Sequence, residues 1–213
     1  MSRVLHVDLE TYSDIDIGKC GAYRYVDSPN FEILLLAYAY DDDSVTVIDL
    51  AQGEAIPKDV LADITNEGVT KVAHNAAFER ICLSKFLNTK LDPKTWHCTM
   101  VHALSLGFPA SLADVGKALN LEEDKQKMAV GKRLITYFCK PCKPTQANGQ
   151  RTRNYPHHDL EKWNLFKDYN RQDVVTEQAI YDRLMKFPLP EMSGYCTAWI
   201  SQSMITASGS IRI

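Results

Sequence analysis

The chain has 213 residues, of which 45% are hydrophobic and 24% are charged, and its formal net charge is −3. This length suits one sizeable domain, and the apolar share is large enough to build a core. The slightly negative charge argues against a protein that coats nucleic acid through an overall positive field, but it is compatible with an enzyme that has a local acidic site. The longest apolar stretch, residues 33–40, is far too short to span a bilayer, so we expect no membrane partner.

Three strands are predicted in close succession near the start of the chain. They cover residues 3–8, 31–40 and 45–50, where apolar and β-branched residues concentrate. Asp41, Asp42 and Asp43 separate the second strand from the third, and this charge run predicts a solvated hairpin turn rather than a metal site. Such short connections favour an antiparallel meander.

Helices alternate with two further short strands in the rest of the chain. Strands are expected over 70–73 and 93–98, and the polar stretch 140–156, rich in Pro, Gly, Asn and Thr, predicts a loop. The predicted helices cover 57–66, a segment that follows residues 74–79 and ends near 87, 99–106, 111–119, 123–138, 159–185 and a short segment at 197–205. This order predicts an α/β fold with a mixed sheet of about five strands flanked by helices.

Six cysteines are scattered along the chain: Cys20, Cys82, Cys98, Cys139, Cys142 and Cys196. Polar residues interrupt the opening segment where a secretory signal would be apolar, so we expect reduced thiols in a cytoplasmic compartment. A zinc site made of Cys139, Cys142, His157 and His158 is the weaker alternative, because adjacent histidines in an extended chain point apart.

Two carboxylates stand one residue apart in the first predicted strand, at Asp8 and Glu10. Successive side chains of a strand point to opposite faces, so these two acids share a face. If the strand is buried, as its apolar neighbours indicate, the acids repel each other and lose hydration. A divalent cation is the simplest compensation, and an exposed strand with acidic residues is the alternative reading of this segment.

Two predicted helices carry further groups at a useful spacing. Asn75 and Glu79 are four residues apart at the entrance to one helix, and Tyr169 and Asp173 are four apart on the long helix. Residues at positions i and i+4 lie one above the other, so each helix can present a pair of groups to one point. If that point is the end of the first strand, four acids converge: Asp8, Glu10, Glu79 and Asp173. Hard oxygen ligands of this kind select Mg²⁺ or Mn²⁺ over Zn²⁺.

Three segments resemble, in order, the three exonuclease motifs of the DEDD (DnaQ-like) 3′–5′ exonucleases: Asp8-Leu9-Glu10-Thr11, His74-Asn75-Ala76-Ala77-Phe78-Glu79 and Tyr169-Asn170-Arg171-Gln172-Asp173. The tyrosine one helical turn before the last acid resembles the DEDDy branch, which is typical of polymerase proofreading domains. A wider likeness to the N-terminal exonuclease domain of phage and prophage family A DNA polymerases is carried by residues 21–25, 73–83, 139–144, 151–154 and 163–173. It implies an exonuclease domain over residues 1–186 and an extension over 187–213 that resembles the start of a polymerase region.

The resemblance implies an RNase H-like fold and phosphodiester hydrolysis with two divalent cations, Mg²⁺ or Mn²⁺. It implies that Asp8 bridges both ions, that Glu10 and Asp173 complete the shell of one ion, and that Glu79 holds the second, directly or through water. Tyr169 then orients the attacking water. The family usually has Asp at the position of Glu79, and a ligand that acts through water tolerates the extra methylene better than a direct ligand.

Eight basic residues and no acidic ones lie in the segment 125–154: Lys125, Lys127, Lys132, Arg133, Lys140, Lys143, Arg151 and Arg153. This local charge predicts a wall that contacts phosphates beside the metal site, with a solvated helix face and loop as an equal alternative. Terminal bases of a single strand are expected to stack on apolar or aromatic groups. The candidate substrate contacts are Leu9, Thr11, Asn75, Phe78, Arg133, Arg151 and Arg153.

The resemblance implies a metal-dependent exonuclease that hydrolyses single-stranded DNA from its 3′ end to nucleoside 5′-monophosphates, and the acidic cluster predicted from spacing fits such an enzyme. The resemblance implies a proofreading domain, in the cytoplasm of a bacterial host, with a polymerase domain in the same longer chain. A free-standing exonuclease that trims DNA or RNA, an RNase H-like endonuclease, and a catalytically decayed module that binds 3′ ends remain as alternatives.

Overall fold

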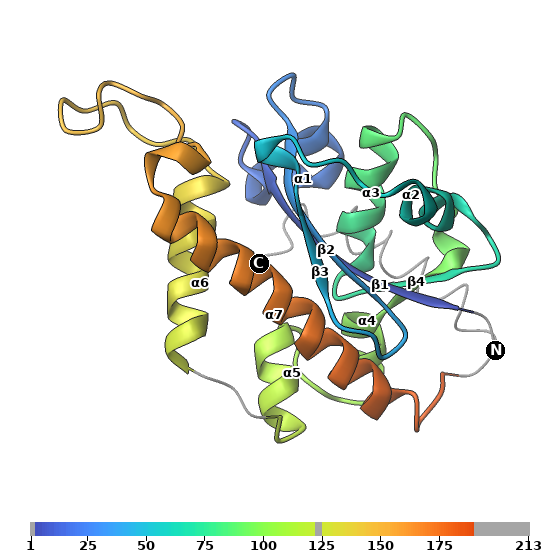
Figure 1. Cartoon of the computed structure of the whole chain (residues 1–213). Helices are drawn as coiled ribbons and strands as arrows, with labels where there is room; N and C mark the ends of the chain where they lie inside the picture. The colour runs from blue at the N-terminus through green and yellow to red at the C-terminus, as the bar shows by residue number, and fades with distance from the viewer. Residues whose placement is uncertain (1–2, 122–124, 190–213) are drawn as a thin grey trace.

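The computed structural model describes residues 3–121 and 125–189, which form an α/β fold around a mixed sheet (Figure 1). The five strands of this sheet lie in the order β3-β2-β1-β4-β5. Their bounds are β1 Val4–Tyr12, β2 Glu32–Tyr40, β3 Thr46–Asp49, β4 Thr70–Ala73 and β5 Trp96–Cys98. The strands β1, β2 and β3 pair in antiparallel fashion. β4 pairs with β1 in parallel, and β5 pairs with β4 in parallel. The predicted meander and the mixed sheet are confirmed.

Two strand boundaries differ from the prediction. β1 continues to Tyr12 because its last residues stay paired with β2, across an irregularity in register between Glu10 and Thr11. β5 begins only at Trp96, since Pro93–Thr95 forms a 3₁₀ turn capped by the side chain of Asp92. In both cases the pairing partner and the local turn decide the strand end, and neither is visible from periodicity.

The α-helices of the described residues are α1 Ile17–Val26, α2 Lys58–Thr65, α3 Ala76–Phe86, α4 Thr99–Ser105, α5 Leu112–Ala118, α6 Lys125–Phe138 and α7 Leu160–Leu184. Six of them match the prediction, and residues 139–155 form the expected loop. The prediction missed α1. Asp16 caps this helix by accepting a hydrogen bond from the Gly18 amide, but Gly21 interrupts it with a φ of 75°. Glycine is typical of turns, so its presence at position 21 weakened the helical signal of this segment in the sequence.

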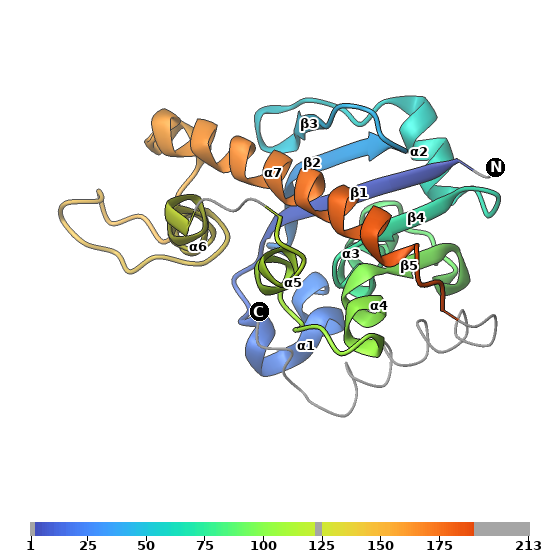
Figure 2. The ribbon, with the colours of Figure 1, turned by 90° about the horizontal axis from the view of Figure 1, so that it is seen from below.

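The helices cover both faces of the sheet. The long helix α7 crosses one face over β1, β2 and β3, while α1 and α3 lie on the other side (Figure 2). The main core lies between that other face and its helices, where Leu5, Val7 and Leu9 of β1 are buried. Because side chains alternate along a strand, the remaining β1 residues His6, Asp8 and Glu10 face α7. This alternation places these polar side chains between β1 and α7.

A second apolar cluster holds α6 against the first half of α7. Leu134 and Phe138 of α6 pack with Trp163 and Phe166 of α7, and all four side chains are at most 3% exposed. The Phe138 ring lies 4.8 Å from the Trp163 ring and 5.4 Å from the Phe166 ring, measured between centroids. The position of α6 beside α7 is therefore set by packing.

Several predictions fall outside the described residues. The start of the helix expected over 123–138, Cys196, the helix at 197–205 and most of the extension 187–213 belong to this group. The division into two domains at residue 186 therefore stays a prediction. Within the described ranges, no helix combines the length and the apolar character that a membrane span requires.

Candidate active site

Three acids meet where β1 passes under α7. Asp8 and Glu10 project from the same face of β1, and Asp173 projects from the fourth turn of α7. One carboxylate oxygen from each lies within 4.8 Å of those of the other two. In the part of the chain that the structure describes, only this trio of Asp, Glu, His or Cys side chains gathers closely enough to hold a metal ion. The sequence predicted these three residues as a metal site.

The protein leaves these acids poorly solvated. Burial raises the pKa of Asp8 from its ordinary 3.8 to about 6, and a hydrogen bond from Asn170 opposes this rise. Burial also raises the pKa of Glu10 well above its usual range, and the charges of Asp8 and Asp173 push it further in the same direction. Close carboxylates in a dry site disfavour ionisation, and an added cation reverses that preference. The site is therefore arranged for a positive ion.

Glu79 lies beside this trio, in the first turn of α3. Its side chain is 4% exposed, and its Oε2 is buried without a hydrogen-bond partner. Burial raises its pKa well above the usual range, and the neighbouring charge of Asp8 adds to the effect. A buried acceptor without a donor is costly, so this oxygen is one that a cation or a bound water can satisfy. The structure thus brings the fourth predicted acid to the site, although its oxygen does not join the group of three.

Tyr169 precedes Asp173 by one turn of α7, as predicted. Its hydroxyl is hydrogen-bonded to the Asp173 carboxylate, and its ring is partly buried. Burial raises the pKa of this phenol, followed in importance by the charges of Asp173, Glu10 and Asp8. The hydroxyl therefore stays protonated and is available to donate or accept one hydrogen bond at the acidic cluster.

Asn170, His6 and Glu177 belong to the same interface but were not singled out in the sequence. Asn170 is completely buried and donates a hydrogen bond of 2.7 Å from Nδ2 to Asp8 Oδ2. His6 Nδ1 lies 2.6 Å from Glu177 Oε2, and both side chains are buried. His6 precedes Asp8 by two residues and Glu177 follows Asp173 by four. The spacing rules that linked the acids could therefore have found this pair as well.

The predicted uncharged substrate contacts differ in their burial. Leu9 is 5% exposed and belongs to the core on the opposite face of β1. Thr11 is also buried, and its hydroxyl lies 2.9 Å from the Tyr25 hydroxyl. Asn75 and Phe78 are half-buried at the start of α3, where Asn75 adopts a left-handed φ of 70°. Of these four residues, Asn75 and Phe78 keep part of their surface available to a ligand.

Two of the three predicted basic contacts already bind other residues of the protein. Arg133 is exposed on α6. Arg151 is tied into the loop through Asn154 Oδ1 at 2.7 Å, and Arg153 forms an ion pair of 2.5 Å with Glu32. The side chains of Lys125 and Lys127 lie outside the described residues. Arg151 and Arg153 therefore have structural partners already, and a role in phosphate binding stays a prediction.

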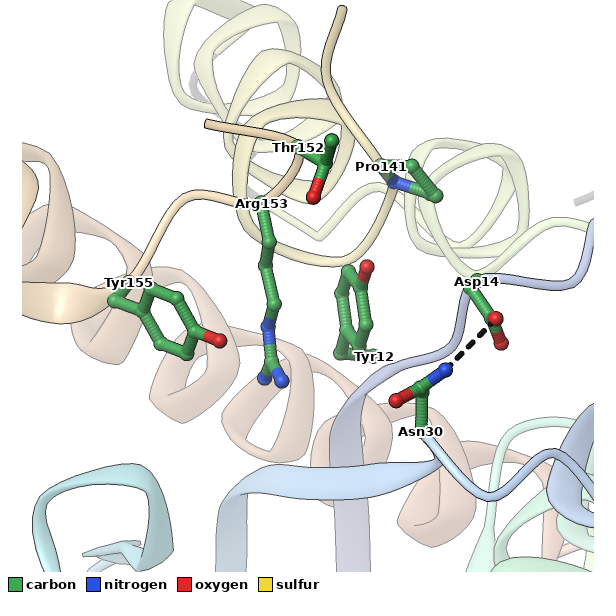
Figure 3. Close-up of a pocket in the computed structure, with 7 residues that line it drawn as sticks. All are labelled: Tyr12, Asp14, Asn30, Pro141, Thr152, Arg153 and Tyr155. Carbon is green, nitrogen blue, oxygen red and sulfur yellow. Dashed lines mark hydrogen bonds between the residues drawn. The ribbon is translucent and has the colours of Figure 1, made fainter. Parts of the chain in front are cut away.

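Arg153 also forms one wall of a cavity of about 250 Å³ beyond the end of β1 (Figure 3). Its guanidinium lies 3.7 Å from the centroid of the Tyr12 ring and 4.7 Å from that of Tyr155. The cavity is lined by Tyr12, Asp14, Asn30, Pro141, Thr152, Arg153 and Tyr155. The stacked arginine holds the 139–155 loop against the end of β1.

The structure offers no support for the zinc alternative. Cys139 is buried, and its thiol points toward Glu10 Oε2 at 3.7 Å. Cys142 donates to the carbonyl oxygen of Arg151, while His158 Nδ1 accepts the amide of Tyr155. Among residues that the structure describes, these cysteines and histidines do not form a group that could bind a metal. The cysteines of the described part are free thiols, as expected.

Known proteins resemble this chain in sequence and in fold. No family model matches the sequence. Over 185 residues, or 87% of this chain, the sequence is 54% identical to a DNA polymerase of Bacillus phage SP02. The chain spans only 28% of that polymerase's length. The predicted likeness to a phage DNA polymerase is thus confirmed for the aligned segment.

Two solved structures share the architecture. Brucella melitensis NrnC superposes with a TM-score of 0.56 and 14% identity, covering 97% of this chain and 83% of the other. Trypanosoma brucei RNase D, in a complex with GMP, gives a TM-score of 0.56 and 16% identity, covering 99% of this chain and 59% of the other. The chain has the fold of RNase H-like nucleases. The fold expected from the three motifs is confirmed.

Proposed function

We propose that this chain is a metal-dependent 3′–5′ exonuclease of the DEDDy type that hydrolyses single-stranded DNA ends to nucleoside 5′-monophosphates. The observation that carries the proposal is the meeting of Asp8, Glu10 and Asp173 within 4.8 Å, with Tyr169 hydrogen-bonded to Asp173. The phage polymerase relative supports DNA as the substrate and proofreading as the role. In that role the domain is part of a longer polymerase chain in the cytoplasm of the bacterial host.

The residues of the site fit two divalent cations, Mg²⁺ or Mn²⁺. Carboxylate oxygens are the ligands that these hard cations prefer, and burial raises the pKa values of Asp8 and Glu10, which a bound cation would lower again. Asp8, Glu10 and Asp173 would hold one ion, and Asp8 with Glu79 would hold the other. A structure of Brucella melitensis NrnC contains bound Mg²⁺, with a TM-score of 0.56 to this chain. When bound, the cations supply charge neutralisation at the phosphate and a more acidic water.

The side chains around the acids then position the reactants. Asn170 holds the Asp8 carboxylate in one orientation through its 2.7 Å hydrogen bond. The neutral Tyr169 hydroxyl orients a water molecule toward the terminal phosphorus. The water loses a proton to solvent, and its oxygen forms a bond to phosphorus as the bond from phosphorus to the 3′ oxygen of the preceding nucleotide breaks. The 3′ oxygen leaves with a proton from solvent, and a nucleoside 5′-monophosphate is released.

A gel assay with end-labelled substrates tests this proposal. We expect the wild-type chain with Mg²⁺ or Mn²⁺ to shorten single-stranded DNA one nucleotide at a time from the 3′ end, and Asp8→Ala to be inactive. Cleavage of circular single-stranded DNA would instead indicate an endonuclease. Binding of 3′ ends without any release of mononucleotide would indicate a decayed module.

A second candidate is an exonuclease that trims RNA, which the shared fold with RNase D favours. The two candidates use the same acids, so the site does not separate them. The same assay with single-stranded DNA, duplex DNA and RNA of matched sequence does so. A rate on RNA at least tenfold above that on DNA would replace the proofreading role with RNA trimming.

A further inference from the structure

A close contact joins α6 to the predicted catalytic tyrosine. Gly131 is a buried residue within α6, and a Cβ atom built on it would lie 2.2 Å from Cε2 and 2.4 Å from Cδ2 of Tyr169. It would also lie 2.9 Å from Cζ of the same ring. Real Cβ atoms do not approach carbon atoms so closely, so only glycine fits here without a shift of the helix or the ring.

Backbone conformation does not explain this glycine. Gly131 lies inside a regular helix, and its φ is not among the positive values that the structure records for other glycines. Glycine is unfavourable inside helices, because it loses more conformational freedom than alanine. The remaining reason for glycine at this position is space for the Tyr169 ring.

Neither partner can easily move away. α6 is anchored by Leu134 and Phe138, which are buried against Trp163 and Phe166. On the α7 side, the Tyr169 ring lies parallel to the Phe166 ring, with centroids 6.5 Å apart and an interplanar angle of 6°. The ring of Tyr169 is therefore confined between the backbone of α6 and its own helix. Its hydroxyl is left in hydrogen-bond contact with Asp173.

We propose that Gly131 is a positioning residue, which lets the α6 backbone press against Tyr169 and thereby fixes the hydroxyl at the acidic cluster. This inference rests on the proposed function, since it assigns the purpose of the contact to the reaction at that cluster. It makes α6 a wall of the catalytic site, in addition to a carrier of basic residues. Gly131 acts only through Tyr169, so its effect on turnover must vanish when the hydroxyl is absent.

The test is a double-mutant cycle between Gly131→Ala and Tyr169→Phe, with kcat, KM and Mn²⁺ affinity measured for each chain. We expect G131A to lower kcat about tenfold to a hundredfold, the range that a misplaced catalytic group produces, with KM and Mn²⁺ affinity nearly unchanged. In the Y169F background, G131A should change kcat less than twofold. Wild-type turnover in G131A, or effects on kcat that multiply, would overturn the proposal.

Thr136→Ala is the matched control. Thr136 is exposed on the same helix, and its replacement also raises the helix propensity of α6, but it adds no atom near Tyr169. We expect T136A to keep the wild-type kcat. A fall in kcat equal to that of G131A would show that any change in α6 slows the reaction, and would refute the specific role of Gly131.

Thermal melting provides a second readout that does not depend on activity. We expect G131A to lower the melting temperature when Tyr169 is present, and to cause no such fall in the Tyr169→Ala background, because the clashing ring is gone. If G131A melts at or above the wild-type temperature, the contact itself is refuted. If the wild-type chain hydrolyses none of the substrates while the melting temperatures show this coupling, the proposed function fails and the contact stands as a structural one only.

Discussion

Replacing Asp8 by Asn should make the metal-free protein more stable at neutral and alkaline pH while abolishing hydrolysis. The amide has nearly the same shape as the carboxylate, and its oxygen can still accept the hydrogen bond from Asn170 that holds Asp8. The substitution therefore removes a buried negative charge without leaving a cavity or an unpaired neighbour. Acids gathered for function should cost stability when no cation is present.

The magnitude follows from the raised pKa of Asp8. Burial raises this pKa from 3.8 to about 6, and each pKa unit corresponds to about 1.4 kcal/mol. The ionised side chain therefore lowers the free energy of unfolding by at most about 3 kcal/mol. Because the folded-state pKa is raised, the wild type has its full stability below pH 3.8 and loses this amount as the pH rises through about 6. D8N lacks this loss.

Urea unfolding in EDTA, from pH 4 to pH 8, measures the difference. We expect D8N and wild type to be nearly equal at pH 4, and D8N to be more stable by about 2–3 kcal/mol at pH 8, which for a domain of this size raises Tm by about 4–12 °C. Asp42→Asn removes an exposed carboxylate in the turn after β2 and serves as the control, with no expected change. Saturating Mn²⁺ should reverse the order, because only the wild type binds the ion strongly.

One result would refute this reasoning. If D8N unfolds at lower urea concentration than wild type at pH 8 in EDTA, the Asp8 carboxylate stabilises the fold. The loss of hydration on burial would then not be the dominant electrostatic effect on Asp8, and a metal-binding purpose would lose its main physical support.

Three further predictions concern neighbours of Asp8. Tyr169→Phe should lower kcat about tenfold to a hundredfold with Mn²⁺ affinity retained, and unchanged kinetics would remove the hydroxyl from the mechanism. Glu79→Gln should lower the rate of mononucleotide release at least tenfold, whereas Glu79→Asp should keep it within a few-fold of wild type. Equal activity of wild type and E79Q would show that this carboxylate is dispensable. Asn170→Ala should weaken Mn²⁺ binding by about 1.5–3 kcal/mol in calorimetry, the value of a hydrogen bond to a charged group, and unaltered affinity would show that Asp8 needs no orientation.

Local spacing in the sequence was enough to predict much of this molecule. The two-residue period of a strand places Asp8 and Glu10 on one face, and the helical period aligns Tyr169 with Asp173, whatever the rest of the chain does. Apolar runs and turn residues likewise predicted the meander, the loop 140–156 and α7. The confirmed likeness to a phage polymerase depended on the same short segments. Each of these features is decided within a few residues, so it can be read locally.

Tertiary structure decided the features that depend on what lies across an interface. The end of β1 at Tyr12 is set by its pairing with β2. The close approach of Gly131 to the Tyr169 ring exists only because α6 packs on α7. The buried state of Glu79, the hydrogen bond from Asn170 and the pairing of His6 with Glu177 arise only when β1, α3 and α7 come together. Sequence periodicity determines which side chains share a face, whereas packing determines what that face meets and how much water it loses.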